Sequence, residues 1–340
     1  MSRTRPGIAR ALALALLAVL LFILAGWGVL ALLYWDHANA LVRNVLAALY
    51  GIVCLALIVA FVRPRWRWRA FGAQLALFAV LLACWESLQP SNQRDWVTED
   101  AVLAYATIDG DHITLHHIRN FDYRTETDFT PGYYDRSFNL QELNEVDLFA
   151  VYWMGPSIAH VFVSFGFTDG SHVAVSIEAR KEKGEGYSTV QGFFRQYELH
   201  YVVADERDVV RLRSNYRHDP PEHVYMYRLR GNGNGVAGKQ LFLAYLREIN
   251  SLKDQAQWYN SISSNCTNSI WLMARLLPGN VPYSWKILIS GYLPDYLYER
   301  GKLDTSVPFE ELRRRGDINA LAQSADQAAD FSQRIRARMP

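Results

Sequence analysis

Cysteine is scarce in this sequence. Only three cysteines occur among the 340 residues, and two of them, Cys54 and Cys84, fall within long hydrophobic runs. The third, Cys266, therefore has no partner for a disulfide in the rest of the chain. An unpaired cysteine in an oxidising compartment is a candidate reactive thiol.

Other features are missing as well, and each excludes a class of function. The net charge is only +1, with 35 basic residues against 34 acidic ones, so bulk charge predicts no nucleic acid or other polyanionic partner. The sequence has no Gly-rich phosphate loop, dinucleotide fingerprint or Gly-x-Ser-x-Gly elbow. Its histidines show no metal-ligand spacing. We therefore expect neither a cofactor nor a metal.

Long apolar runs occupy the N-terminal part of the chain. They cover residues 11–35, 44–62 and 70–85. A membrane-spanning helix needs about 20 apolar residues. A cleavable signal peptide is the alternative for the first run, but its apolar core is only roughly 7–15 residues long. We therefore expect three retained transmembrane helices.

Basic residues flank these runs asymmetrically. They precede the first run and separate the second from the third: Arg3, Arg5, Arg10, Arg63, Arg65, Arg67 and Arg69. Such residues gather on the cytoplasmic side of a membrane. The pattern predicts a cytoplasmic N-terminus and places everything after about residue 90 outside the cytoplasm, which in a bacterium is the periplasmic side of the inner membrane. The chain divides into an anchor over 1–90, a periplasmic domain over 91–316 and a tail over 317–340.

The spacing of apolar residues changes along the predicted periplasmic domain. Alternation predicts strands over 113–118, 146–153, 160–167, 171–179, 199–203 and 224–229. The turn residues Thr168–Gly170 join two of these strands into a hairpin. Helical spacing then predicts helices over 236–252, 266–277 and 309–315, followed by an Ala/Gln/Asp-rich tail that we interpret as a frayed helix. Strands followed by helices favour an α+β fold.

Cys266 opens one of these predicted helices after a polar turn. A helix N-terminus offers unpaired N–H groups and a partial positive charge, and both stabilise a thiolate. The alternative is a small buried hydrophobic residue. The polar neighbours Ser264, Asn265 and Thr267 argue against a dry core. We predict that Cys266 is a nucleophile.

A thiol nucleophile needs a base and a group that orients the base. His160 begins a predicted strand and is the candidate base. A hairpin turn centred on Asp169 would place Glu178 opposite His160, with Cβ atoms about 5 Å apart. Ser176 and His172 share that face and are rivals for the third position. Taken alone, His160 fits a structural histidine better, but its pairing with the isolated cysteine favours catalysis.

Charged stretches near this hairpin allow two interpretations. The run Glu178–Tyr187 fits a solvated loop, or a rim whose Arg180 or Lys181 binds an anionic group such as a lipid phosphate. Asp205–Asp208 and the arginines that follow resemble a surface ion-pair network. The candidate substrate-binding residues are Asn265, Arg180 and Tyr187.

Several stretches together resemble a known family. They are Asn92–Trp96, Arg119–Glu126, His160–Gly170, Ser176–Arg180 and Trp258–Thr267. Over roughly residues 92–300 the chain is similar to the bacterial family defined by the periplasmic domain of Lnb, a lipoprotein N-acyltransferase. More remotely, a strand histidine preceding an Asn-Cys at a helix start resembles the circularly permuted papain-like group, with its NlpC-type peptidase relatives and lecithin:retinol acyltransferases.

The resemblance implies a fold and a chemistry. The fold would be α+β, with three N-terminal transmembrane helices followed by a permuted papain-like (NlpC-type) domain of antiparallel sheet and packed helices. The Cys266 and His160 pair would serve acyl transfer or hydrolysis. One departure matters: in Lnb itself the periplasmic domain precedes the membrane spans, whereas here the spans come first. The resemblance therefore specifies the site better than the substrate.

Three hypotheses follow. In the first, Cys266 takes an acyl group from an inner-membrane phospholipid as a thioester and passes it to an amine, such as that of a lipoprotein. In the second, the same residues hydrolyse peptidoglycan peptides or lipid esters. An apolar pocket would favour lipid, and an open polar groove would favour peptides. In the third, the protein is a non-catalytic membrane scaffold, and His160 lies far from Cys266. The sequence predicts no oligomeric state.

Overall fold

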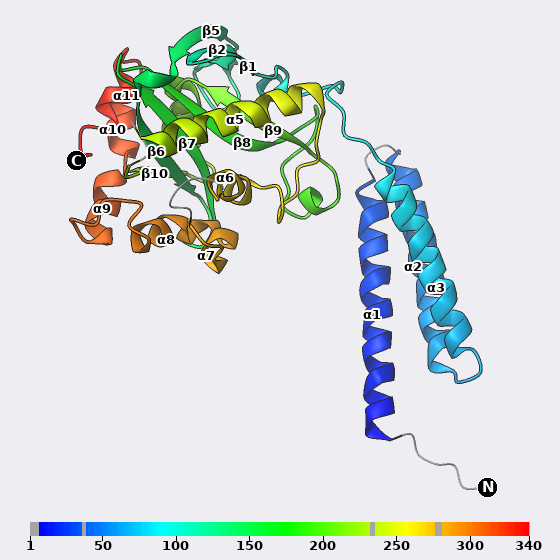
Figure 1. Ribbon diagram of the computed structural model, residues 1–340. Helices are drawn as coiled ribbons and strands as arrows, with labels where there is room; N and C mark the ends of the chain where they lie inside the picture. The colour runs from blue at the N-terminus through cyan, green and yellow to red at the C-terminus, as the bar shows by residue number, and fades with distance from the viewer. Residues whose placement is uncertain (1–6, 36–38, 232–234, 276–280, 340) are drawn as a thin grey trace. The chain divides into compact units, whose positions relative to one another are not determined.

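The chain folds into two units (Figure 1). The computed structural model describes residues 7–35, 39–231, 235–275 and 281–339. The helix unit comprises Met1–Pro90 and Ser188–Gln196, and the sheet unit comprises Ser91–Tyr187 and Tyr197–Pro340. The predicted anchor also ends at residue 90, but the sequence did not indicate that a short segment of the later chain joins the helix unit.

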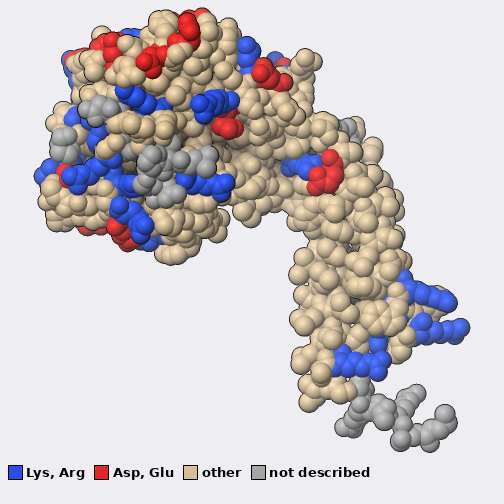
Figure 2. All heavy atoms as spheres, in the orientation of Figure 1, with Lys and Arg blue, Asp and Glu red and all other residues tan. Residues whose placement is uncertain are grey.

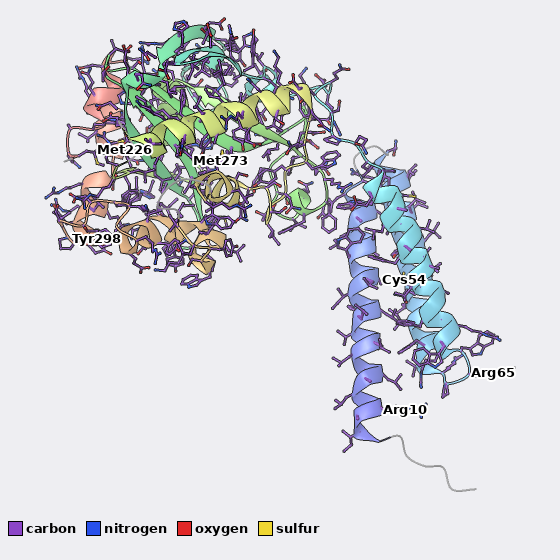
Figure 3. All side chains as sticks on the ribbon, viewed as in Figure 1. Arg10, Cys54, Arg65, Met226, Met273 and Tyr298 are labelled. Carbon is purple, nitrogen blue, oxygen red and sulfur yellow. The ribbon has the colours of Figure 1, made fainter. Side chains whose placement is uncertain are left out.

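Three long helices build the helix unit: α1 (Ile8–Leu33), α2 (Ala40–Val62) and α3 (Arg67–Glu86). Each is long and apolar enough to cross a membrane, as predicted. The face seen in Figure 2 carries no charge along the middle of these helices. Arg10 and Arg65 lie at the same end of the unit (Figure 3). Within the apolar packing, Gln74 Nε2 donates to the Leu21 carbonyl at 2.7 Å, a polar contact that joins α3 to α1.

The segment Ser188–Gln196 packs on this unit through aromatic and charged contacts. The Phe194 ring lies 6.1 Å from that of Trp27 and 5.6 Å from that of Tyr34, centre to centre. The Arg195 guanidinium lies 3.8 Å above the Trp85 ring and 2.7 Å from the Glu86 carboxylate. In sequence the segment falls between two strands of the sheet unit. The two units are therefore joined at three points of the chain.

One large sheet forms the centre of the sheet unit. Its strands are β1 (Tyr105–Asp109), β2 (His112–Arg119), β5 (Tyr133–Asn139), β6 (Leu143–Tyr152), β7 (Ala159–Phe167), β8 (His172–Arg180), β9 (Glu198–Ala204) and β10 (His223–Arg228). The order is β1-β2-β9-β8-β7-β6-β10, and β5 pairs with β2. Pairing is antiparallel except for a single parallel pair that joins β2 to β9. Strands β3 (Asp122–Tyr123) and β4 (Phe129–Thr130) form a small second sheet.

Helices cover both faces of this sheet. They are α4 (Glu206–Arg211), α5 (Val236–Asp254), α6 (Cys266–Ala274), α7 (Trp285–Leu288), α8 (Leu293–Glu299), α9 (Phe309–Gly316), α10 (Asn319–Ser324) and α11 (Phe331–Arg334). On one face α5 crosses the strands (Figure 1), and its Phe242 packs 4.8 Å from Phe165. On the other face, α4, α10 and α11 pack around the stacked rings of Phe149 and Phe162. The α+β class is therefore confirmed.

The predicted strands and helices occur near their predicted ends, with three differences. The helix predicted over 266–277 ends at Ala274, and its last two residues lie outside the described part of the chain. The tail is not frayed, because Ile318, Phe331 and Ile335 are buried in the second core. The stretch from Asp205 is not a surface network, because α4 buries it against the sheet. In both cases the apolar residues are few, so the sequence shows no clear helical stripe.

Candidate active site

The site lies where β7 and β8 separate. Their ladder runs from Gly166–His172 to Val163–Val175 and ends there. Strand β8 goes on pairing with β9 as far as Arg180–Glu198, while β7 goes on pairing with β6 as far as Ala159. The separation leaves space beside His160 and frees that edge of β7 from the ladder. A side chain from a helix can therefore reach both His160 and the backbone of β7.

His160 meets two side chains of β8 in this space. Its Nε2 lies 2.7 Å from Ser176 Oγ and 3.0 Å from Glu178 Oε1. Ser176 also donates its hydroxyl to Glu178 at 2.6 Å. The register of the hairpin, continued past Val163–Val175, would pair residues 160 and 178, as the sequence predicted. Both the predicted third member and one of its rivals therefore contact the imidazole.

A buried arginine holds the carboxylate in place. Arg213, on the π-helical turn η4 (Leu212–Tyr216), donates from Nη2 to Glu178 Oε1 at 2.8 Å. Its Nη1 lies 3.3 Å from Glu222, which also pairs with Arg217 at 3.1 Å. Positive and negative side chains thus alternate from His160 through Glu178 and Arg213 to Glu222. A buried carboxylate needs such partners to remain ionised.

Cys266 approaches His160 from α6. The helix begins at this residue, and the Asn265 side chain caps it by accepting a hydrogen bond from the Asn268 N–H at 2.8 Å. The thiol interacts with the His160 side chain and with the backbone N–H of Val161. Because Nε2 faces β8, the ring nitrogen left for Cys266 is Nδ1. The thiol, imidazole and carboxylate therefore form one connected series.

The electrostatics favour an ion pair between the thiol and the imidazole. Burial opposes protonation of His160, but Glu178 and Cys266 outweigh it and raise the pKa of His160 to about 9. Burial opposes ionisation of Cys266 too, but His160, the Val161 N–H and Thr267 lower the pKa of the thiol. Burial likewise works against Glu178, yet His160 and Arg213 hold its pKa well below the usual range. Both shifts favour a thiolate beside an imidazolium.

The remaining predicted residues lie in different environments. His172 Nε2 contacts Glu145 at 2.8 Å, far along the hairpin from His160, so it is not the third member. Asn265 serves as the helix cap described above. Tyr187 is exposed, and its hydroxyl lies 3.4 Å from that of Tyr259. Tyr259 is buried, and its pKa is raised by burial and, to a smaller extent, by Cys266 and Glu178. Tyr187 is therefore close enough to the site to remain a candidate for substrate binding.

Arg180 does not form an exposed rim. Its side chain is buried, and it donates to the carbonyls of Asp100 at 2.8 Å and Ala101 at 3.1 Å. It also donates to Asn92 Oδ1 at 3.1 Å and stacks 4.1 Å from the Trp96 ring. Every nitrogen of the guanidinium thus has a partner within the sheet unit. The prediction that Arg180 binds an anionic group is not supported by this position.

Two residues of the site were not predicted. Arg213 was assigned to a surface network, because a run of charges usually marks a solvated face. Tyr259 lies in the turn before Cys266. Nothing in the sequence around it predicts that its side chain is buried near the thiol. Only the proximity of Tyr259 to Cys266 in the chain could have suggested it.

A second cluster could in principle hold a cation. Ligand atoms of Glu145, Asp147 and His172 lie within 4.8 Å of one another. However, Arg336 Nη2 lies 2.8 Å from Asp147, and Arg228 pairs with both Glu145 and Asp147. These arginines already neutralise the carboxylates, so we assign no metal to the cluster.

The fold and site together are those of a membrane-anchored α+β domain with a cysteine, a histidine and a carboxylate in series. The family described as the Lnb N-terminal periplasmic domain matches residues 129–291, which include all three side chains. This match confirms the resemblance over those residues, where the sheet unit is similar to a periplasmic domain of that type. With the three apolar helices, it makes the protein a membrane-anchored periplasmic protein. Neither curated proteins nor solved structures gave a match.

Proposed function

We propose that this protein is a membrane-anchored thiol acyltransferase that takes an acyl group from a phospholipid and passes it to a lipoprotein-type amine. The observation that carries the proposal is the series Cys266, His160 and Glu178, with the thiol pKa lowered and the imidazole pKa raised. A non-catalytic scaffold required the thiol and imidazole to lie far apart, whereas they interact. The series also agrees with the permuted papain-like arrangement of a strand histidine and a helix-start cysteine.

The reaction would proceed in two balanced steps. The Cys266 thiolate attacks the ester carbonyl carbon, and the Cys266 N–H at the start of α6 is a candidate donor to the oxyanion. The ester C–O bond then breaks, and the proton of the His160 imidazolium goes to the leaving alkoxide. In the second step an amine attacks the thioester, His160 takes its proton, and the thiolate is released. Ester and amine become alcohol and amide, and Glu178 steadies the charged imidazole throughout.

Exposed apolar side chains beside the site favour a lipid over a peptide. Ile158, two residues before His160, is exposed, as are Trp285 and Leu288 of α7. The turn that follows α7 contacts the start of β7, where the Ala159 N–H donates to Ser290 Oγ at 3.0 Å. Exposed apolar groups gathered at one place are typical of contacts with lipid or protein. This observation supports a lipid substrate over peptidoglycan peptides.

The location follows from charge. Arg10 and Arg65, the latter between α2 and α3, lie at one end of the helix unit (Figure 3), and positive residues favour the cytoplasmic side. We propose a bacterial inner-membrane protein with its N-terminus in the cytoplasm. The acyl donor would then be a phospholipid of the periplasmic leaflet.

The test uses the full-length protein in detergent micelles containing phospholipid radiolabelled in its acyl chains. We expect a hydroxylamine-labile label on the wild type that is absent from Cys266→Ala and His160→Ala. Cys84→Ala and His112→Ala are matched controls, because Cys84 is an exposed cysteine of α3 and His112 an exposed histidine of β2. Both should label like the wild type.

Addition of a lipopeptide with a free N-terminal amine distinguishes the acceptors. Transfer of the label to the amine supports the proposal, whereas release only as free fatty acid would establish a lipid hydrolase instead. A folded protein that takes up no label, although iodoacetamide modifies Cys266 readily, contradicts the proposal and directs the search to peptidoglycan fragments.

A further inference from the structure

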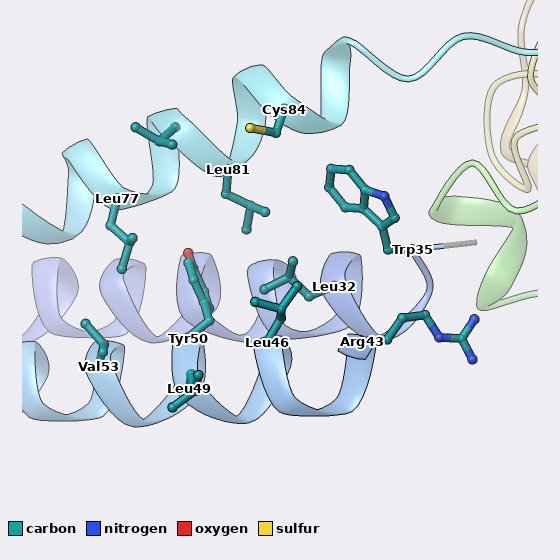
Figure 4. A pocket seen from close by; sticks show the side chains of 11 residues that line it. Leu32, Trp35, Arg43, Leu46, Leu49, Tyr50, Val53, Leu77, Leu81 and Cys84 are labelled. Carbon is teal, nitrogen blue, oxygen red and sulfur yellow. The ribbon is translucent and has the colours of Figure 1, made fainter. Parts of the chain in front are cut away.

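The helix unit contains a groove of about 430 Å³ between its three helices (Figure 4). Its walls are almost entirely apolar and are formed by Leu32, Trp35, Leu46, Leu49, Tyr50, Val53, Leu77, Val80, Leu81 and Cys84, with Arg43 as the only charged residue. Volumes of this size are typical of small-molecule sites. The composition suits a hydrocarbon chain with a charged group at one end.

A close packing contact forms the floor of the groove. The Tyr50 ring lies against α1 at Gly28, where a Cβ atom would meet the ring at only 2.5 Å. A side chain at position 28 would therefore push Tyr50 outward and into the groove. The glycine thus keeps the hollow open.

The length of the groove along the helices is about the thickness of the hydrocarbon layer of one leaflet. Arg43 stands at one end and Val53 and Leu77 at the other (Figure 4). Arg43 and Val53 are separated by ten residues of α2, which at 1.5 Å per residue is about 15 Å. The hydrocarbon core of a bilayer is about 30 Å thick, so this is about half of it. This length matches the acyl chain of a lipid in one leaflet.

Arg43 is available to bind an anion at its end of the groove. Arg43 lies in the first turn of α2, at the end of the helix unit to which the chain of the sheet unit is attached. Its Nε is buried, and among the described residues it has no hydrogen-bond partner. Arginine binds phosphate through paired N–H donors, and at this depth it would meet the headgroup layer.

We propose that this groove is a binding site for one glycerophospholipid, with an acyl chain between the helices and the phosphate at Arg43. With the orientation proposed above, the lipid belongs to the periplasmic leaflet. The site is distinct from the thiol site and does not depend on the proposed reaction. It would hold a lipid whether or not that lipid is an acyl donor.

The test uses the full-length protein in nanodiscs of phosphatidylethanolamine and phosphatidylglycerol containing a photoreactive phosphatidylethanolamine with a diazirine on its acyl chain. Cross-links are mapped by mass spectrometry and are expected to concentrate on Leu46, Leu49, Leu77 and Leu81. The same experiment in Cys266→Ala excludes a label acquired through acyl transfer, so its outcome is independent of the outcome for the proposed function.

Matched variants make the test specific. Leu49→Trp and Ile52→Trp both change apolar residues of α2 that are 56% and 65% exposed, but only Leu49 lines the groove. We expect Leu49→Trp to remove most of the label and Ile52→Trp to leave it unchanged. Arg43→Gln should lower the yield of cross-linked lipid by about five-fold, since one arginine near a headgroup contributes about 1 kcal/mol. Arg63→Gln, at the other end of α2, should not.

Three outcomes overturn the proposal. The first is label spread evenly over groove and outer faces, which is what surrounding bulk lipid gives. The second is equal labelling of Leu49→Trp and wild type. The third is a yield of cross-linked lipid in Arg43→Gln equal to that of the wild type.

Discussion

Glu178 Oε1 lies 3.0 Å from Nε2 of His160, although the ladder joining their strands ends three residues earlier, at Val163 and Val175. The contact therefore passes through side chains across an opened sheet. The opening serves two purposes, since it makes room for Cys266 and exposes the Val161 N–H to the thiol. The geometry of the candidate site thus depends on the point at which two strands separate.

The first prediction concerns the pH dependence of the thiol. Because the pKa of Cys266 is lowered and that of His160 is raised to about 9, a thiolate persists below the ordinary thiol pKa while the imidazole stays protonated. Alkylation of Cys266 by iodoacetamide should therefore reach its full rate at a lower pH than alkylation of an ordinary thiol. In His160→Ala the rate should instead rise at higher pH than in the wild type, because only the Val161 N–H and Thr267 then oppose the effect of burial.

The measurement is the rate of Cys266 modification from pH 5 to 10, followed by mass spectrometry of the peptide that contains it. His112→Ala is the control and should keep the wild-type profile. A wild-type profile that rises with an ordinary thiol pKa would show that no ion pair forms.

The second prediction concerns the carboxylate. Glu178→Gln keeps the shape of the side chain but removes the charge that raises the His160 pKa. An opposite charge at this distance shifts a pKa by about 1–3 units, so the imidazolium should lose its proton that much earlier as pH rises. The alkaline limit of activity should move down from about pH 9 by the same amount. Activity at the optimum should fall less than in Cys266→Ala.

The pH profile of acyl transfer by Glu178→Gln checks this expectation. Ser176→Ala serves as a comparison, since Ser176 contacts the same nitrogen without a charge. Loss of activity in Glu178→Gln with an unshifted profile would assign Glu178 a merely structural role.

The sequence predicts those parts of the site that depend on residues close together in the chain, and it misses those that join distant residues. The hairpin of β7 and β8 is local, because its turn and alternation specify the register, and they placed Glu178 opposite His160. Cys266 was recognised from helix-start chemistry that is also local. Arg213 was not, because its contact with Glu178 joins η4 to β8 across 35 residues.

Buried charge was the main source of error. Arg180, Arg213 and Asp208 all lie in charge-rich stretches that favour a solvated surface, yet each is buried. Their partners come from distant parts of the chain, as when Arg119 meets Asp208 at 2.7 Å. No local pattern distinguishes an arginine that will find a buried carboxylate from one that stays in water.

The third prediction separates Arg180 from Tyr187. Arg180→Met leaves the carbonyls of Asp100 and Ala101 without their donor, and each unsatisfied buried group costs about 1–3 kcal/mol. The variant should unfold at lower urea concentration, with an unchanged KM for lipid. Tyr187→Ala, at an exposed ring, should raise KM several-fold with unchanged unfolding. A raised KM in a stable Arg180→Met would restore Arg180 as a ligand for the substrate.

The last prediction concerns the network that holds the C-terminal segment on the sheet. Arg336 Nη2 lies 2.6 Å from Glu206 and 2.8 Å from Asp147, and all three side chains are largely buried. Arg336→Ala leaves Glu206 without an arginine, whereas Asp147 keeps its pair with Arg228, and breaking a buried pair costs about 3–5 kcal/mol. Arg334→Ala, two residues away, removes only an exposed pair with Asp330 and should change the free energy of unfolding by less than about 0.5 kcal/mol.

The same network sets an acid limit to stability. Burial opposes ionisation of Glu206, but Arg336 and its other partners lower its pKa from 4.5 to about 2. A carboxyl whose pKa is lower in the folded state stabilises the fold fully above its unfolded pKa and loses that contribution as pH falls. Urea unfolding should therefore show stability that falls between about pH 4.5 and 2 by roughly 3 kcal/mol from this group. In Arg336→Ala this part of the pH dependence should be much reduced, whereas Arg334→Ala should retain it.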